Sequence, residues 1–348
     1  MSSLPVFQER YPHEEGFAAL FAHEIAPLLQ DMEQDRETTL IKFGVAVVGF
    51  VFAFAMAAFW LSPMLSSTSE NVRDAYTGIL TVIGMIGFGI LFYLYNSYGK
   101  RLKGRIVPLI ADFFGNLFYS AEAYLPFSKT GPFGILPGHT TYTGEDRLVR
   151  PTVFESSELK LTETRGSGKN RRTVTKFKGL ALYFNLPRKV SARIIVKPDG
   201  GAIGNWLSGF LKDERVTLED PLFEKLFEVY CRDQIESRRV LQPALMLRMV
   251  QFAELMANWG RDINELPDGS RPGELPDPDT LTASGVKFSA SFLDDGLLML
   301  VSCRKNLFQP GSLFTSAYDL NEIRCVLYQI HLIRLIADEL KKFPQLVD

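Results

Sequence analysis

The chain has 348 residues, of which 46% are hydrophobic, and a formal net charge of −2 at pH 7. This length predicts about two domains, and the apolar content is enough for a sizeable core. The nearly neutral charge argues against a nucleic-acid binder with a basic body. The three cysteines, Cys231, Cys303 and Cys325, lie far apart, which argues against a disulfide framework and a zinc site.

Residues 1–42 are expected to form a cytoplasmic helical segment. Apolar side chains recur there at three- and four-residue spacing, at Phe17, Leu20, Phe21, Ile25, Leu28, Leu29 and Met32. This spacing predicts an amphipathic helix whose opposite face is acidic. We expect the apolar face to pack against another helix of the same protein. An interfacial membrane helix is the alternative, but such helices favour basic polar faces.

Two uncharged apolar runs follow, at residues 43–61 and 76–96. At a rise of about 1.5 Å per residue, each run approaches the ~30 Å thickness of a hydrocarbon core. Buried helices of a soluble core are the alternative. However, uncharged runs of this length with charged flanks favour a membrane, and the tyrosines and tryptophan near the run ends suit the headgroup layer. The sequence therefore predicts a transmembrane hairpin over residues 43–96.

Basic residues beside the two runs predict the orientation of the hairpin. They occur at Arg36 and Lys42 on one flank and at Lys100, Arg101, Lys103 and Arg105 on the other, whereas the connector has only Arg73. An excess of lysine and arginine marks the cytoplasmic side of a membrane protein. We therefore expect a multi-pass membrane protein with both termini in the cytoplasm.

Small residues predict how the two runs pack. Gly49, Ala53 and Ala57 share one face of the first run, and a similar face of the second run holds Thr77, Thr81 and Gly84. Such faces let helix backbones approach closely in lipid, so we expect an antiparallel hairpin. The same faces would permit a homo-oligomer. Neither run contains an ionisable residue, which argues against an ion or proton pathway.

Residues 97–130 are expected to be a membrane-proximal helix and linker. The stretch 104–126 is predicted to be helical, with Pro108 near its start and Pro126 beyond its end. The stretch 127–144, "FSKTGPFGILPGHTTYTG", is dense in glycine and proline and predicts a linker into the next domain.

Residues 131–348 are predicted to form a cytoplasmic α+β domain, which makes the fold class membrane-anchored α+β. Strands are expected at 172–186, 191–198 and 215–220 from β-branched and aromatic content. Helices are expected at 240–259 and 319–340. The turn "LDDG" within 285–303 predicts a hairpin. Four prolines and many acidic residues near 261–280 predict a mobile acidic loop.

Motifs for catalysis are weak in this chain. "GSGKN" at Gly166–Asn170 lacks the lead glycine of a phosphate loop, which is Glu163 here, and Asn170 replaces the magnesium-binding Ser or Thr. No GxSxG or HExxH segment is present. His331 lies beside the apolar stripe of the last predicted helix and is interpreted as an edge residue. We therefore predict no catalytic, cofactor-binding or metal-binding residue.

Residues 165–198 contain basic but no acidic side chains. The basic residues are Arg165, Lys169, Arg171, Arg172, Lys176, Lys178, Arg188, Lys189, Arg193 and Lys197. A solvated face is the simplest interpretation. The alternative is a surface that contacts anionic lipid headgroups or another anionic ligand, since each basic group near an anionic leaflet contributes about 1 kcal/mol.

The stretch Leu218–Asp233, "LEDPLFEKLFEVYCRD", combines carboxylates and a thiol with aromatic side chains. Asp220 and Pro221 are expected to start a turn or helix, and Asp233 to cap the helix at 234–241. Cys231 lies in an apolar strand-like segment without a neighbouring Lys or His that would lower its pKa. We therefore predict structural roles for these residues.

Residues 218–252 also resemble the domain-of-unknown-function 3137 family of bacterial membrane proteins. The resemblance rests on an acidic-Pro-x-Phe segment, an "F-x-V-Y-x-x-D" core, an "L-x-P" helix start and an "F-x-G-L" strand, here at 177–180. Its signature residues in this chain are Asp220, Pro221, Phe223, Phe227, Tyr230, Asp233 and Pro243. The stretch 287–311 is similar to the late hairpin of the family. The resemblance implies the two-span architecture but no known activity, and it implies envelope-associated partners such as LemA-type membrane proteins, near which some relatives are encoded.

Two functions are compatible with these features. The preferred hypothesis is a non-enzymatic membrane protein that presents its α+β domain for binding or assembly. The alternative is a membrane-tethered enzyme that acts on a phosphorylated or lipid-headgroup substrate beside residues 165–197. The second hypothesis expects a pocket where basic residues meet Asp233, Asp294 or His331, whereas the first expects an exposed patch at the helix 243–259.

Overall fold

The computed structural model describes residues 4–66, 69–199, 214–257, 286–303 and 305–342. The acidic loop predicted near 261–280 therefore lies outside the described residues. The chain forms two compact units, each built from separate stretches of sequence. Unit 1 comprises Met1–Gln8, Ala18–Ile106 and Gln309–Ile323, and unit 2 comprises Glu9–Phe17, Val107–Phe308 and Arg324–Asp348.

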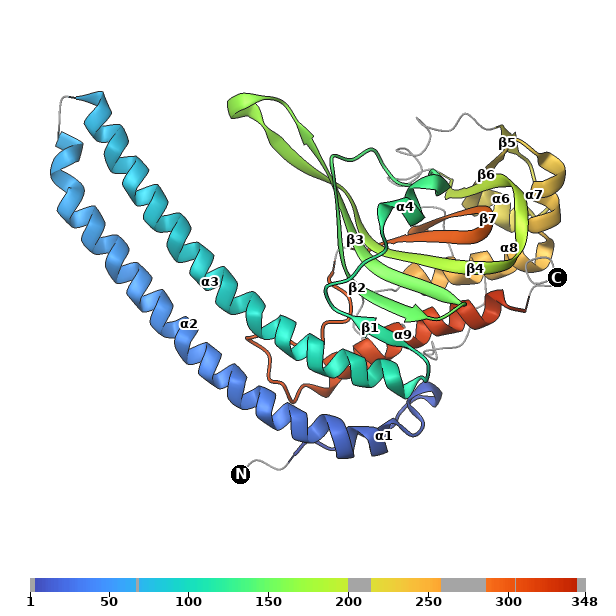
Figure 1. Cartoon of the computed structure of the whole chain (residues 1–348), viewed down its shortest axis with the longest axis horizontal. Coiled ribbons are helices and arrows are strands. Elements are labelled where there is room, and N and C mark those ends of the chain that lie inside the picture. Colours follow the sequence, from blue (N-terminus) through green and yellow to red (C-terminus); the bar gives the residue numbers. More distant parts are fainter. Residues whose placement is uncertain (1–3, 67–68, 200–213, 258–285, 304, 343–348) are drawn as a thin grey trace. The chain divides into compact units, whose positions relative to one another are not determined.

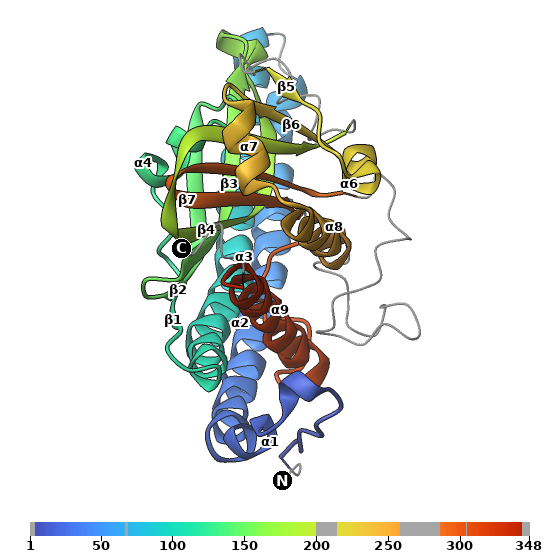
Figure 2. The ribbon, with the colours of Figure 1, turned by 90° about the vertical axis from the view of Figure 1, so that its right-hand side faces the viewer.

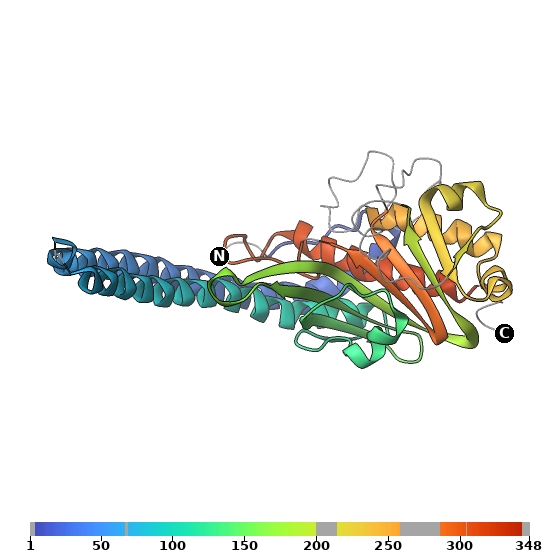
Figure 3. The ribbon, with the colours of Figure 1, turned by 90° about the horizontal axis from the view of Figure 1, so that it is seen from above.

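Two long helices form most of unit 1. A short helix α1 (Phe17–Leu20) and a π-helical turn at Phe21–Ile25 lead directly into α2 (Ala26–Leu61), and α3 (Glu70–Phe113) returns antiparallel to it (Figure 1). Seen from another direction, the two helices still run side by side (Figure 3). Both are long and apolar enough to cross a membrane by length and composition.

The predicted small faces of the spans do not form the contact between α2 and α3. Outside the helix's own backbone, no described atom lies within 4 Å of a Cβ atom placed at Gly49 or Gly84, and Ala53, Thr77 and Thr81 are exposed. The close approach is at Gly87, which is buried, because the ring of Phe50 occupies the space that a Cβ atom would need. The two helices therefore approach each other where the ring of Phe50 packs on Gly87, and not along the predicted stripe of small residues.

The apolar stripe of the N-terminal segment is buried as predicted. Phe21, Ile25, Leu29 and Met32 are each at most 1% exposed. On α3, Tyr98, Leu102 and Ile106 are fully buried. Arg101 of α3 donates to Asp35 of α2 at 2.9 Å. The stripe therefore packs within the protein rather than lying on a membrane surface.

The helix predicted over 104–126 ends earlier than expected. α3 continues through Pro108 but stops at Phe113, and Gly115 and Asn116 follow with positive φ values of 71° and 53°. Left-handed residues at this position end helices because they redirect the chain away from the helix axis. The following residues instead form strand β1 (Phe118–Ser120).

Unit 2 contains a seven-stranded sheet in which every pairing is antiparallel, so the predicted α+β class is confirmed. After β1 come β2 (Thr141–Arg150), β3 (Phe154–Arg165), β4 (Arg172–Pro198), β5 (Arg215–Val216), β6 (Phe227–Cys231) and β7 (Phe288–Ser302). The strand order is β1-β2-β3-β4-β6-β5, and β7 also pairs with β4 (Figure 1).

The predicted hairpin at "LDDG" is present, and both of its arms belong to β7. The N–H of Ser302 donates to the carbonyl of Lys287 at 2.8 Å, so the two ends of β7 lie side by side and the chain reverses between them. Asp294 lies in the turn with a positive φ of 48°. The arm after the turn pairs with Gly179–Asn185 of β4 and the arm before it pairs with Val190–Val196, so the two expected strands 172–186 and 191–198 are parts of the single 27-residue strand β4.

Helices and loops cover the two faces of the sheet in unit 2. On one face the segment containing α4 (Phe127–Thr130) packs Leu125, Phe133 and Ile135 against strand residues such as Leu159 and Leu298. On the other side lie α7 (Gln234–Val240) and α8 (Pro243–Ala257), which contact β4 and β7 respectively (Figure 2). The unit also includes α6 (Pro221–Leu226) and most of α9 (Leu320–Leu340).

Candidate functional site

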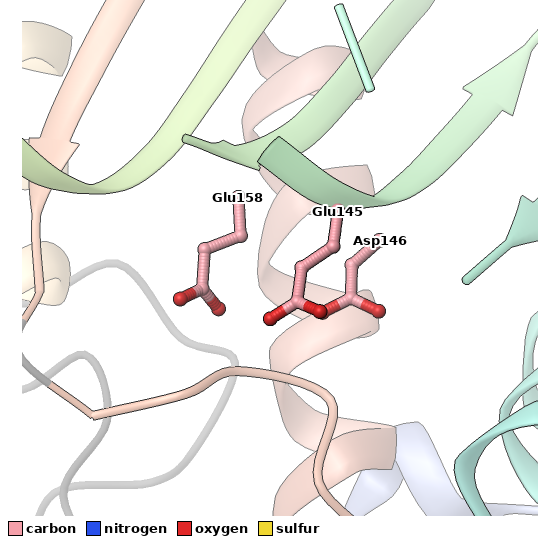
Figure 4. Close-up of side chains that lie close together, drawn as sticks. All are labelled: Glu145, Asp146 and Glu158. Atoms are coloured by element: carbon pink, nitrogen blue, oxygen red, sulfur yellow. The ribbon is translucent and has the colours of Figure 1, made fainter. Parts of the chain in front are cut away.

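Three carboxylates lie close together at the bulge of β2. Side-chain oxygens of Glu145, Asp146 and Glu158 all lie within 4.8 Å of one another (Figure 4). Glu145 and Glu158 are opposite each other on β2 and β3, and the register shifts immediately after Glu145. This shift, with a positive φ of 62° at Asp146, brings a third acidic side chain to the pair.

Neighbouring groups hold these carboxylates in place. The hydroxyl of Tyr119 donates to Asp146 at 2.5 Å, and burial together with the charge of Asp146 raises the pKa of that tyrosine. The backbone N–H of Leu307 donates to Glu158 at 2.9 Å, and Lys178 Nζ lies 3.7 Å from the same carboxylate. The cluster therefore joins β1, β2, β3 and β4 to the segment after β7.

Carboxylate oxygens are the donors that hard cations such as Ca²⁺ and Mg²⁺ prefer. By distance, Glu145, Asp146 and Glu158 could hold such an ion, although two of them already bind protein groups. The sequence did not predict this cluster. The adjacent acids at 145–146 are visible in the sequence, but only the strand register places Glu158 opposite them.

The ten basic residues of 165–197 are spread along the β3–β4 hairpin rather than gathered on one surface. Arg165, Arg171 and Arg172 are exposed at its end, where β3 turns into β4 (Figure 1). Arg188 and Lys189 are exposed at the bend of β4, and Arg193 is half-buried on the second arm. The side chain of Lys169 is outside the described part of the chain.

At least four of these basic residues are in ion pairs. Arg165 and Lys176 lie 2.7 and 3.3 Å from Glu163, and Lys178 lies near Glu158. Lys197 is 5% exposed and pairs with Glu228. Paired side chains have less charge available for an external anion. The predicted contact with lipid headgroups therefore depends mainly on the exposed end of the hairpin.

The signature residues at 220–243 have the structural roles that the sequence predicted. Asp220 accepts hydrogen bonds from the N–H groups of Leu222 and Phe223, and Pro221 is the first residue of α6. Asp233 caps α7 in the same way, by accepting from Ile235 and Glu236. Side-chain oxygens at this position satisfy N–H groups that a helix leaves free.

The remaining signature residues belong to the core or to turns. Phe227 of β6 is fully buried and stacks on Phe223 with 4.9 Å between ring centroids. The hydroxyl of Tyr230 donates to Glu228 at 3.1 Å. Pro243 is the first residue of α8. Cys231 is buried beside these groups, and its thiol donates to the carbonyl of Asp233 at 3.1 Å.

The enzyme hypothesis expected a pocket where basic residues meet Asp233, Asp294 or His331, and these three residues lie on different elements. Asp233 caps α7, Asp294 lies in the turn of β7, and His331 of α9 stacks on His13 with 4.7 Å between ring centroids. Burial, together with the charges of His13 and Arg334, lowers the pKa of His331 to about 4. A pocket at the C-terminal end of α9 is lined by other residues, including Phe184 and Leu340.

The patch that a binding protein was expected to expose at 243–259 is mostly buried. Leu245, Met249 and Phe252 of α8 are at most 3% exposed, whereas Leu247 is 41% exposed. This helix therefore belongs largely to the core of unit 2, because its apolar face contacts the sheet.

The largest exposed apolar surface lies instead on α2 and α3, and we call it the apolar belt. Its large side chains, each at least 37% exposed, are Ile41, Val45, Val48, Val51, Phe52, Phe54, Met56, Phe59, Trp60, Ile79, Val82, Met85, Ile86, Phe88, Ile90, Phe92, Tyr93 and Tyr95. In the most apolar stretches of the two helices, only 0% and 6% of the residues are buried. The belt therefore has no cover within the described protein.

Comparison with known proteins finds one family that part of the chain resembles. Residues 175–263 match the family model described as "Protein of unknown function (DUF3137)". The matched segment contains most of β4 and all of β5, β6, α6, α7 and α8, with the signature residues above; the apolar belt and β7 lie outside it. No curated protein and no solved structure matches the chain. The resemblance seen in the sequence is thus confirmed over residues 175–263, where the chain is similar to the DUF3137 family.

Proposed function

We propose that the chain is an integral protein of the bacterial inner membrane that presents its α+β unit in the cytoplasm for binding or assembly. The observation that supports this proposal is the apolar belt on α2 and α3. Moving one large apolar side chain out of water is worth about 1.5–3 kcal/mol, so a belt of this size strongly favours an apolar environment. Core helices of a soluble protein would be mostly buried, and these are not.

Contacts within unit 2 support two membrane crossings. Glu9–Phe17 precedes the apolar helices and Val107–Phe308 follows them, yet both belong to the same compact unit. Glu14 and Arg324 form a buried ion pair at 2.5 Å, and Phe17 contacts Phe113 with 5.2 Å between ring centroids. A single crossing would separate these segments by a bilayer, whereas two crossings return the chain to the same side.

The basic flanks support a cytoplasmic location for this side. Six basic residues flank the belt, two before the first run and four after the second, whereas the connector has Arg73. The positive-inside rule favours the orientation in which unit 2 faces the cytoplasm. Binding or assembly is proposed rather than catalysis because the pocket at the C-terminal end of α9 is not lined by Asp233, Asp294 or His331. Envelope proteins such as LemA-type proteins, or further copies of this chain, remain our proposed partners.

Alkaline extraction and thiol labelling test membrane insertion and orientation. The full chain should stay in the membrane pellet at alkaline pH, and its release into the supernatant would contradict the proposal. After Cys231, Cys303 and Cys325 are replaced, a cysteine at Ser66 should react with an impermeant maleimide from outside the cell. A cysteine at Ile235, which is 82% exposed on α7, should react only after lysis. The reverse pattern would overturn the orientation.

The binding role needs its own measurement. Cross-linking in native membranes, followed by purification of the chain, should yield a defined product that contains a partner protein or a second copy. A chain that stays monomeric and uncross-linked would contradict a role in binding or assembly, even if the membrane insertion were confirmed.

A further inference from the structure

A tight turn at Ser312–Thr315, between β7 and α9, presents one aromatic side chain. The N–H of Ser312 donates to the hydroxyl of Thr315 at 2.8 Å, and the N–H of Thr315 donates back to the carbonyl of Ser312 at 3.3 Å. Within the turn, Leu313 is fully buried while Phe314 is 60% exposed. The turn therefore holds its backbone by its own hydrogen bonds and directs one ring outward.

An ion pair of α2 fixes this turn to that helix, within unit 1. Glu33 and Arg36 pair at 2.6 Å. Arg36 donates to the carbonyl of Leu313 at 3.3 Å, and Glu33 accepts from the N–H of Ala317 at 2.7 Å. Burial alone would raise the pKa of Glu33, but the hydrogen bonds from Arg36 and Ala317 outweigh it and lower the pKa. The Glu33–Arg36 pair thus binds the turn on both sides, at Leu313 and at Ala317.

The exposed ring lies at the end of both apolar runs. Its centroid is 5.6 Å from that of Phe43, at the start of the first run, and 5.6 Å from that of Tyr95, at the end of the second. Residues 309–318 contain no charged side chain. Lys42, just before the first run, and Lys100, just after the second, are exposed. Phe314 is therefore level with the boundary between the apolar belt and its basic flank.

We propose that Phe314 is an interfacial membrane anchor, through which the segment 309–318 inserts into the cytoplasmic headgroup boundary of the bilayer. This inference rests on the proposed membrane insertion of α2 and α3. Aromatic rings favour the interface between headgroups and acyl chains. We expect lipid, rather than protein, to contact Phe314, because its ring extends the apolar belt at Phe43 and Tyr95. The C-terminal part of the chain thereby contacts the membrane at a third place, beside the two spans.

Tryptophan fluorescence in vesicles with brominated lipids tests this anchor. The native Trp60, Trp206 and Trp259 are replaced by Phe, and a single tryptophan is introduced as Phe314→Trp. Phe43→Trp is the positive control, and Ile235→Trp on α7 is the negative control. Lipids brominated near the headgroup should quench Phe314→Trp and Phe43→Trp to the same extent. Lipids brominated near the bilayer centre should quench both less, and Ile235→Trp should remain unquenched.

The outcomes separate the anchor from the membrane insertion itself. If Phe43→Trp is quenched by lipid and Phe314→Trp only by aqueous acrylamide, the anchor is overturned and the membrane insertion stands. Protection of Phe314→Trp from both quenchers would show that protein covers the ring, which also overturns the anchor. If lipid quenches neither tryptophan, both the anchor and the proposed membrane insertion of α2 and α3 are overturned.

A second measurement applies if the tryptophan-free chain does not fold. A benzophenone side chain at position 314 of the otherwise native chain should cross-link to lipid on illumination, and the product should be a lipid adduct by mass spectrometry. Cross-links to protein alone would overturn the anchor.

Discussion

Replacing Arg324 by Met should destabilise unit 2 more than any surface substitution. Arg324 is 3% exposed at its side chain and pairs at 2.5 Å with Glu14, whose side chain is fully buried. Removing one partner of a buried ion pair costs about 3–5 kcal/mol because the other charge is left buried and unpaired. For a domain of about 200 residues, 1 kcal/mol corresponds to roughly 2–4 °C, so the midpoint of thermal unfolding should fall by about 10 °C.

The buried thiols of unit 2 supply the assay for this prediction. Cys231 and Cys303 are buried, and burial raises the pKa of Cys303, so both should react with a fluorogenic maleimide only when unit 2 unfolds. Arg334→Met on the same helix is the matched control, since Arg334 is 41% exposed and lies 3.4 Å from Asp338. Exposed pairs contribute about 0–1 kcal/mol, so the control should unfold close to the native temperature.

A double variant shows whether charge is the cause. Glu14 also accepts hydrogen bonds from the N–H groups of Arg10 and Tyr11, and Glu14→Gln keeps an acceptor for them. Glu14→Gln combined with Arg324→Met should therefore recover much of the loss of the single variant. If Arg324→Met unfolds like the control, or if the double variant is no better than the single one, the reasoning from a buried unpaired charge is refuted.

Three further substitutions test other parts of the structure. Gly179→Ala should cost more than about 2 kcal/mol, since a Cβ atom there would overlap the backbone of β7, whereas Gly104→Ala, with open space around it, should be neutral or stabilising in the same thermal assay. Glu236 has its pKa lowered to about 2 by hydrogen bonds from Arg239 and the N–H of Ser191, so its contribution to the free energy of unfolding is full above pH 4.5 and is lost as the pH falls towards 2. Glu236→Gln should therefore flatten the acid dependence of urea unfolding over this range, and an unchanged slope would contradict it. The hydroxyl of Tyr98 has no hydrogen-bond partner among the described residues, so Tyr98→Phe should be neutral or stabilising by up to about 1 kcal/mol, whereas Tyr142→Phe, which loses a bond to the carbonyl of Leu125, should destabilise by about that amount.

Local patterns in the sequence were sufficient for several elements. The uncharged runs predicted two long apolar helices, and the stripe at Phe21, Ile25 and Leu29 predicted a buried face, because helical periodicity shows directly which side chains share a side. The caps at Asp220 and Asp233 were also predicted, since a cap depends only on the residues that immediately follow it.

Contacts between distant elements were harder to predict. "LDDG" was correctly predicted as a hairpin turn, but the sequence did not show that both arms of the hairpin pair with β4. The small residues at Gly49 and Ala53 suggested a helix contact that the structure places at Gly87 instead, since the rotation of each helix about its axis depends on the other helix.

The amino-acid sequence by itself determined the apolar helices, the α+β class and the family signature, because these depend on composition and short-range spacing. Only the tertiary structure decided that Glu145, Asp146 and Glu158 meet, that Arg324 is buried against Glu14, and that Phe314 lies beside Phe43 and Tyr95. The last two contacts join residues hundreds of positions apart, and the carboxylates meet through a strand register. No local pattern encodes these contacts, because each depends on how the whole chain packs.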